Sequence, residues 1–219
     1  MTYAVLIPLK ATTRGKSRLG LPDGPRAALA RAMALDTVAA VRGAAGVSLV
    51  LVLTEDVPDA DALAGCGVEV VLTDVRGLNE TIAEGARLLT ARGWTGPVAV
   101  LPGDLPFLTA ADLAAALATA AGGPGVVADA DGTGTTLLAA ASSGELRPQF
   151  GVGSYRRHRD AGAVGLTVPA ASTLHRDVDV LSDLREPGSP AVPGRHTRAV
   201  LDGLRGSVDR GSSQVTVLP

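Results

Sequence analysis

The chain has only two lysines, Lys10 and Lys16, and both lie shortly after an apolar run at residues 3–7. Every other strongly basic side chain is an arginine, and Arg18 joins the two lysines in the same stretch. An ammonium is a compact, strongly hydrated point charge, whereas a guanidinium is a planar fork. The choice of lysine indicates a loop that binds anions such as phosphates or carboxylates. A loop directly after a buried strand is also where open α/β sheets bind ligands.

This lysine stretch does not match the glycine-rich nucleotide loops. Gly15-Lys16-Ser17 is similar to the end of a P-loop, but the first glycine of that motif would fall at position 10, which is Lys10. No G-x-G-x-x-G follows a predicted strand, so a dinucleotide dehydrogenase lacks its usual support. Two lysines in a surface loop are often only solvated, and the functional interpretation depends on their position and on the absence of lysine elsewhere.

Asp104 follows the apolar run of residues 98–101, within Gly103-Asp104-Leu105-Pro106. The run predicts a buried strand, which places the carboxylate at the carboxyl edge of a sheet, and Pro106 forces a turn. Such a carboxylate suits Mg²⁺, which prefers one or two carboxylates together with substrate phosphates. The alternative, that Asp104 only caps the following turn, has equal weight on this evidence.

Asp177 and Asp179 alternate in the stretch Arg176-Asp177-Val178-Asp179 near the end of the fold. In a strand over residues 175–180 they would lie on one face, where two carboxylates repel unless a cation joins them. An edge strand with solvated carboxylates is the alternative, and local evidence slightly favours it. Together with Asp104, however, these residues indicate carboxylates that converge on a Mg²⁺ bridging nucleotide phosphates.

Two stretches rich in glycine and hydroxyl side chains are candidate anion sites. Gly132-Thr133-Gly134-Thr135-Thr136 lies between two predicted strands, and Phe150-Gly151-Val152-Gly153-Ser154 precedes a helix with several cations. Backbone amides beside small residues and at helix N-termini bind anions. A plain turn accounts for the first stretch equally well, and Ser154 acting as an N-cap accounts for the second.

The composition favours one well-filled domain and excludes several functional classes. The chain has 219 residues, is 46% hydrophobic and has a formal net charge of −2, which gives no electrostatic case for nucleic acid. Its aromatic content of 2% also disfavours base stacking. A single cysteine excludes an intrachain disulfide, and the three scattered histidines match no zinc spacing. No apolar run is long enough for a membrane span or a signal peptide, so we expect a cytoplasmic protein.

Apolar β-branched runs alternate with alanine-rich stretches, which predicts βαβ units and a mainly parallel sheet. The predicted strands are residues 3–9, 47–53, 68–72, 97–102, 126–128, 136–140, 166–168 and 175–180. The predicted helices are residues 25–42, 59–64, 79–92 and 110–121, followed by a basic helix that includes residues 156–159. We expect one domain over residues 1–184 and a proline-rich linker with a loosely attached tail over residues 185–219, where residues 196–204 form a short helix.

In combination, these motifs resemble the phosphoenolpyruvate and 2-phospho-L-lactate guanylyltransferases, which serve the biosynthesis of coenzyme F-420. The matching positions occur in the family's order over nearly the whole predicted domain: Lys10, Lys16 to Leu19, Gly103 to Pro106, Gly132 to Thr135, Phe150, Gly151, Ser154, His158 and Asp177 to Asp179. The alanine-rich, arginine-biased composition resembles the actinobacterial members. That subgroup is associated with phosphoenolpyruvate as the acceptor.

The resemblance implies a Rossmann-like, GT-A-like nucleotidyltransferase fold with three layers and a mixed, mainly parallel sheet. It implies that GTP donates GMP to phosphoenolpyruvate, giving enolpyruvyl-diphospho-5′-guanosine and pyrophosphate, with Mg²⁺ as cofactor. The roles it assigns fall into three groups: Lys10, Lys16 and Arg18 as the catalytic cations; Asp104 and Asp177 as metal ligands; and Thr135, Gly151 and Ser154 as the acceptor-binding residues. Nucleotide binding would involve Lys10, Lys16, Asn79 and Asp104.

Alternatives remain open at this level. The acceptor can be 2-phospho-L-lactate or another small phosphorylated acid. A nucleotidyltransferase for molybdopterin or sugar phosphates is disfavoured because the first loop reads Pro8-Leu9-Lys10-Ala11 instead of the glycine-rich pattern of those enzymes. A non-catalytic nucleotide-binding regulator is disfavoured because Asp104 and Asp177 are both present. Homodimer formation and hand-off of the product to a downstream transferase also stay open.

Overall fold

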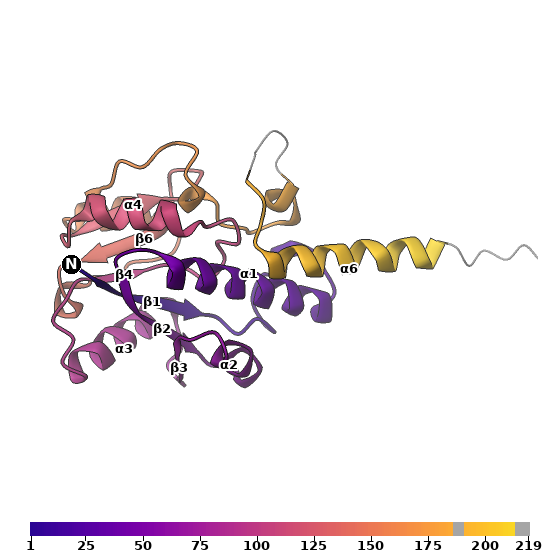
Figure 1. The fold of residues 1–219 in the computed structure, drawn as a ribbon, viewed down its shortest axis with the longest axis horizontal. Helices are drawn as coiled ribbons and strands as arrows, with labels where there is room; N and C mark the ends of the chain where they lie inside the picture. The colour runs from indigo at the N-terminus through magenta and orange to yellow at the C-terminus, as the bar shows by residue number, and fades with distance from the viewer. Residues whose placement is uncertain (186–190, 213–219) are drawn as a thin grey trace, which may run out of the picture.

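The computed structural model describes residues 1–185 and 191–212, and it forms a seven-stranded mixed sheet covered by helices on both faces (Figure 1). The strand order is β3-β2-β1-β4-β6-β5-β7. The strands are β1 (Tyr3–Leu9), β2 (Val47–Thr54), β3 (Glu69–Leu72), β4 (Val98–Val100), β5 (Gly125–Ala128), β6 (Thr135–Ala140) and β7 (Val164–Gly165). The helices are α1 (Asp23–Gly43), α2 (Val57–Ala64), α3 (Leu78–Ala91), α4 (Ala110–Ala120), α5 (Ser154–Asp160) and α6 (Arg195–Ser212).

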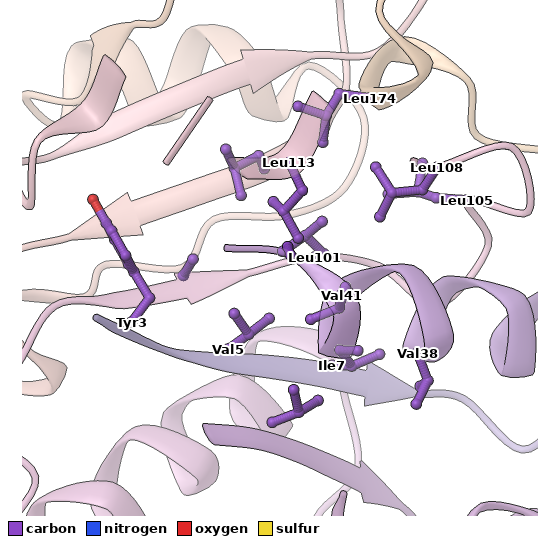
Figure 2. Packing of buried hydrophobic residues seen from close by; sticks show 14 of the residues in the cluster. Tyr3, Val5, Ile7, Val38, Val41, Leu101, Leu105, Leu108, Leu113 and Leu174 are labelled. Atoms are coloured by element: carbon purple, nitrogen blue, oxygen red, sulfur yellow. The ribbon is translucent and has the colours of Figure 1, made fainter. Parts of the chain in front are cut away.

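Alternation along β1 builds the two cores on either side of the sheet. Tyr3, Val5 and Ile7 belong to the core on the face of α1 and α4, and Figure 2 shows Val5 and Ile7 on the same side of the sheet as Val38 and Val41. The intervening residues of β1 pack against α3 on the opposite face. Because β1 is buried along its whole length on both faces, its sequence is a continuous apolar run and not an alternating one.

The order of the strands reverses at the centre of the sheet. β1 pairs in parallel with β2 on one side and with β4 on the other, and β6 then adds antiparallel to β4. The chain therefore leaves β1 in one direction and returns on its other side. The carboxyl ends of β1 and β4 form the switch point at which ligands bind in sheets of this kind. The expected three-layer fold with a mixed, mainly parallel sheet is confirmed.

The two last predicted strands are wrong. The strand expected at residues 166–168 is instead the two-residue β7, which ends at Gly165. Residues 175–180 form no strand, because a 3-10 helix occupies Thr173–His175. The backbone amides of Asp179 and Val180 both donate to a side-chain oxygen of Asp183, at 2.8 Å each, and so cannot join a ladder.

The C-terminal helix is longer and better anchored than expected. α6 begins at Arg195, one residue before the expected helix of residues 196–204, and it packs along α1 before extending away from the body (Figure 1). The backbone amides of His196 and Thr197 donate to the buried Asp36 of α1, at 3.0 and 2.8 Å. The start of this tail is therefore attached firmly, and residues 186–190 of the predicted linker lie outside the described residues.

Candidate functional site

The lysine loop, residues 10–19, begins at the carboxyl end of β1 and is held by two buried charged side chains. Asp59 at the start of α2 accepts the backbone amide of Thr12 at 2.9 Å and its hydroxyl at 2.6 Å. Arg26 in α1, also buried, donates to the carbonyl oxygens of Thr13 and Gly15. These bonds pair one backbone amide and two carbonyls that no regular element would pair, and they fix the path of the loop.

Lys16 adopts a left-handed backbone conformation with φ of 56°, which is uncommon for a residue with a side chain. Its Nζ lies 2.5 Å from Oδ2 of Asp104 and 2.8 Å from Oδ1 of Asp179. Burial lowers the pKa of Lys16, but the charges and hydrogen bonds of Asp104 and Asp179 outweigh it and leave the pKa raised. The ammonium is therefore charged at neutral pH, and its partners are the carboxylates of Asp104 and Asp179.

Asp104 lies in the turn after β4, and close packing holds this turn in place. A Cβ at position 103 would meet Cδ2 of Leu9, so glycine lets this turn lie against the end of β1 without displacing that side chain. Thr37, a fully buried hydroxyl of α1, accepts the backbone amide of Leu105 at 3.0 Å. The Oδ1 atom of Asp104 is buried and has no hydrogen-bond partner within the described part of the chain. A buried anionic oxygen without a partner needs a cation or donor from outside.

Three carboxylates, which we call the acid cluster, meet at this point: Asp104, Asp177 and Asp179. The amide of Val178 donates to the carbonyl of Asp104 at 3.1 Å, and the buried Val178 side chain anchors the segment. Burial, followed by the charges of Asp104, Asp129 and Asp179, raises the pKa of Asp177 to about 7. The hydrogen bond from Lys16 keeps the pKa of Asp179 low. Asp104 thus lies beside the segment from Asp177 to Asp179, as predicted, although that segment does not form the predicted strand.

The donor set of the acid cluster fits magnesium. A divalent cation held by Asp104 and Asp177 would neutralise the partnerless Oδ1 of Asp104 and would offset the repulsion that raises the pKa of Asp177. Among the described residues, no three His, Cys, Asp or Glu side chains form a ready ligand set, so a cation here would also need oxygens from a substrate. That combination of few carboxylates and several phosphate oxygens is typical of Mg²⁺.

A cavity of about 680 Å³ opens beside the acid cluster, over the carboxyl ends of β1, β2, β3 and β4. Lys10, Lys16 and Arg18 line it together with Asp104 and Asp179, so all three predicted cations face one cavity. The Arg18 side chain is 76% exposed and lies 3.4 Å from Asp179. The opposite wall is formed by residues 73–78, which connect β3 to α3. The cavity has the volume of a small-molecule site, and several cations line it.

The predicted acceptor residues lie on a second part of the same sheet edge. The hydroxyls of Thr135 and Ser154 are 3.0 Å apart, and the Thr135 hydroxyl is 3.0 Å from Nδ1 of His158. Gly151 stands in the adjoining loop with φ of 123°, a conformation that favours glycine. The structure therefore brings Thr135 and Ser154 into contact and places Gly151 three residues from Ser154 on the loop that leads into α5.

Asn79 takes a place that its sequence position does not predict. Its side-chain amide donates to the carbonyl of Phe150 at 3.1 Å and its oxygen accepts the Phe150 amide at 2.7 Å. Both polar ends of Asn79 therefore hold the loop of Gly151 against the start of α3. Nucleotide binding by Asn79 stays a prediction, and its visible role is to join the two parts of the site.

Sequence reasoning missed the residues that hold these groups in place. Thr37, Arg26 and Asp59 lie within or at the start of helices, where a polar residue normally indicates a solvated face or a cap. Arg26 and Thr37 are two of several polar residues in an alanine-rich helix, and the sequence does not single them out. His158 was noted as a motif residue, but no role followed from its position.

Comparison with known proteins adds a family to this geometry. The sequence model of the family described as "Guanylyl transferase CofC like" matches residues 3–211. A protein of Streptomyces coelicolor named phosphoenolpyruvate guanylyltransferase is 43% identical over 204 residues, covering 91% of this chain and 96% of that protein. One of the same name from Geodermatophilus obscurus is 43% identical over 210 residues, covering 92% and 94%.

Solved structures share the fold at low sequence identity. A protein described as a nucleotide-diphospho-sugar transferase from Desulfovibrio desulfuricans G20 superposes with a TM-score of 0.67 at 17% identity, covering 96% of this chain and 98% of that one. A 4-diphosphocytidyl-2C-methyl-D-erythritol synthase superposes with a TM-score of 0.56 at 16% identity, covering 83% and 94%. These likenesses concern the fold alone. In the part of the chain that the structure describes, no helix is long and apolar enough to cross a membrane.

Proposed function

This chain belongs to the CofC-like guanylyl transferases, and we propose that it transfers GMP from GTP to phosphoenolpyruvate. The acceptor follows the names of the relatives that are 43% identical over nine-tenths of the chain. The products would be enolpyruvyl-diphospho-5′-guanosine and pyrophosphate. The observation that carries the proposal is the acid cluster with Lys16, placed beside a cavity at the switch point between β1 and β4.

The reaction joins two phosphates and needs no protein nucleophile. An oxygen of the acceptor phosphate attacks the α-phosphorus of GTP, and the bond from that phosphorus to the bridging oxygen breaks. The electron pair of that bond leaves with pyrophosphate. Because the acceptor phosphate is already ionised at neutral pH, the protein's task is to position the groups and to neutralise their charge.

The cations and carboxylates of the cavity divide this task. Lys10, Lys16 and Arg18 would offset the negative charge of the triphosphate. Asp104 and Asp177 would hold Mg²⁺, which when bound supplies a Lewis acid for the phosphate oxygens. The Lys16 ammonium, between Asp104 and Asp179, keeps the acid cluster from repelling the triphosphate before any metal is bound.

The acceptor would bind along the sheet edge toward Thr135 and Ser154. β6 pairs antiparallel to β4 with Leu138 opposite Val100, so Thr135 lies about as far beyond the end of β4 as the turn of Asp104 does. The hydroxyls would bind the carboxylate while the phosphate points to the metal. 2-Phospho-L-lactate, which differs mainly in planarity at one carbon, is the alternative acceptor for the same residues.

A coupled assay for pyrophosphate tests the proposal. We expect release only when GTP, Mg²⁺ and a three-carbon phosphorylated acid are all present, with phosphoenolpyruvate the better acid. Asp104→Ala and Asp177→Ala should abolish turnover with little change in melting temperature. Asp61→Ala, an exposed carboxylate of α2, is the matched control and should leave turnover unchanged. Failure of every acid with folded protein would overturn the proposal, and better turnover with 2-phospho-L-lactate would reassign the acceptor.

A further inference from the structure

The acceptor part of the site contains a buried chain of hydrogen bonds that phosphate transfer alone does not require. Thr135 at the start of β6 is 8% exposed, and Ser154 and His158 of α5 are each 1% exposed. Nδ1 of His158 bonds the Thr135 hydroxyl, and Ser154 bonds the same hydroxyl, each at 3.0 Å. On its other side the imidazole accepts the backbone amide of Gln149 at Nε2, at 2.9 Å.

The bond from Gln149 determines the tautomer of His158. A backbone N–H can only donate, so Nε2 must present its lone pair. A neutral ring then carries its hydrogen on Nδ1 and donates it to the Thr135 hydroxyl. Burial, together with the neighbouring charge of Arg157, lowers the pKa of His158 to about 4, so the ring is neutral near neutral pH.

This tautomer leaves one hydroxyl hydrogen of the group free to donate. The three side chains carry three hydrogens that can be donated: the Nδ1–H of His158 and the hydroxyl hydrogens of Thr135 and Ser154. Only two bonds exist among the three groups, so one hydroxyl hydrogen remains to donate elsewhere, whichever hydroxyl donates to the other. With the hydrogen on Nε2 instead, Nδ1 would accept from Thr135 and both hydroxyl hydrogens would be used.

We infer that His158 is a positioning residue that keeps one hydrogen of the Thr135–Ser154 hydroxyl pair free to donate to the carboxylate of the acceptor. The identity of that acceptor rests on the proposed function. The surrounding loop is held in support: the Arg157 guanidinium donates to the carbonyls of Gln149 and Val152.

The tautomer can be measured without any substrate. The chain has three histidines, and a long-range proton–nitrogen spectrum of ¹⁵N-labelled protein resolves both nitrogens of each. We expect the His158 signals, assigned by their loss in His158→Asn, to show a protonated Nδ1 and an unprotonated Nε2 near neutral pH. A hydrogen on Nε2, or a charged ring, would overturn the inference whatever the enzyme's substrate proves to be.

Kinetics of paired variants test whether His158 acts through Thr135. His158→Gln can accept from Gln149 but places no donor at Nδ1, and His158→Asn can keep that donor. We expect His158→Gln to raise KM for the acceptor about tenfold or more, the loss typical of one hydrogen bond to a charged group, with KM for GTP nearly unchanged. His158→Asn should recover part of that loss. His196→Gln, at the start of α6, is the control.

A double variant separates positioning from general damage. In a Thr135→Val background, His158→Gln should add little further loss, because the hydroxyl through which it acts is gone. Independent, multiplying losses, or equal increases in KM for GTP, would contradict the inference. If the wild-type protein turned over no acceptor at all, the proposed function would fail while the tautomer measurement still decided this inference.

Discussion

The two parts of the site hold their polar groups in different ways. In the cavity part, Lys16 is paired with Asp104 and Asp179, and Arg18 is largely exposed on a loop. In the acceptor part, Thr135, Ser154 and His158 are more than nine-tenths buried on a strand and a helix. The first part offsets charge with charge, and the second part uses only neutral donors.

Under the proposed function, the difference follows from what each part would bind. Side chains on a loop can exchange carboxylate partners for phosphate oxygens when a triphosphate and a cation arrive together. Buried hydroxyls cannot rearrange in that way, so their donor directions must be set before the ligand binds. Substitutions should therefore act on the first part through charge and on the second part through geometry and protonation.

The largest effect is expected at Lys16. Lys16→Ala removes the charge that faces Asp104 and Asp179, and turnover should fall by about 10²–10³, as for loss of a key electrostatic group. Lys16→Arg should restore activity only in part, because a planar fork does not replace a compact ammonium between two carboxylates. Initial rates of pyrophosphate release measure both. Arg87→Ala, which removes a surface pair with Glu84 on α3 outside the cavity, should change little.

Full activity of Lys16→Arg would show that this part needs charge alone. A drop in melting temperature that parallels the drop in rate would show that the lysine is mainly structural.

In the acceptor part, the stability that His158 contributes should depend on pH. The pKa of His158 is lowered from 6.5 to about 4 in the folded protein, so the unfolded chain binds the proton more readily between these values. The lowered pKa stabilises the folded protein by at most about 3 kcal/mol. This stabilisation is complete above the His158 pKa of the unfolded chain, and it is lost as the pH falls toward the pKa of the folded protein. Urea unfolding at pH values from 7 to 4.5 measures this contribution. We expect the free energy of unfolding to fall more steeply with decreasing pH in the wild type than in His158→Asn.

Subtracting the unfolding free energies of the variant from those of the wild type removes the titration of the carboxylates that both proteins share. Parallel curves would mean that His158 is not a buried neutral ring.

Arg26 should have an intermediate effect, because it supports the charged part without belonging to it. Its guanidinium spans the carbonyls of Thr13 and Gly15, directly before the left-handed Lys16. Arg26→Lys keeps the charge but cannot bond both carbonyls, and it should cost about 2 kcal/mol of unfolding free energy. Turnover should fall with it, while KM for the acceptor stays near the wild-type value.

Thermal unfolding and acceptor titrations check this prediction together. An increase in KM for the acceptor that matched the loss of turnover would show that the two parts are not independent.

Much of the fold was predictable because its central strands are buried on both faces. A short apolar run rich in β-branched residues and followed by a turn rarely forms anything but a buried strand, and β1 was predicted to the residue. Asp104 was predictable for the same reason, since the end of a buried strand fixes where the next polar residue lies. The segment around Asp177 was not, because a single side chain, Asp183, takes the amides that a strand would need.

The supporting residues were beyond prediction for a different reason. Thr37 and Arg26 act on backbone groups more than ten residues away, and neither contact leaves a local pattern. Asn79 lies at the start of α3, and its partner Phe150 is 71 residues distant. The role of His158 depends on the direction of one hydrogen bond, which only coordinates supply.

The smallest effect is expected where the tail meets α1. Asp36 accepts the amides of His196 and Thr197 as a cap of α6, and Asp36→Ala should cost about 1 kcal/mol, as for loss of a helix cap. Asp36 is next to Thr37, which holds the turn of Asp104. If α1 is rigid, turnover should stay at the wild-type level while the melting temperature falls, with Asp202→Ala on exposed α6 as the control. A loss of turnover larger than the loss of stability would instead mean that the tail sets the position of Asp104 through α1, and the charged part would then extend beyond its own loop.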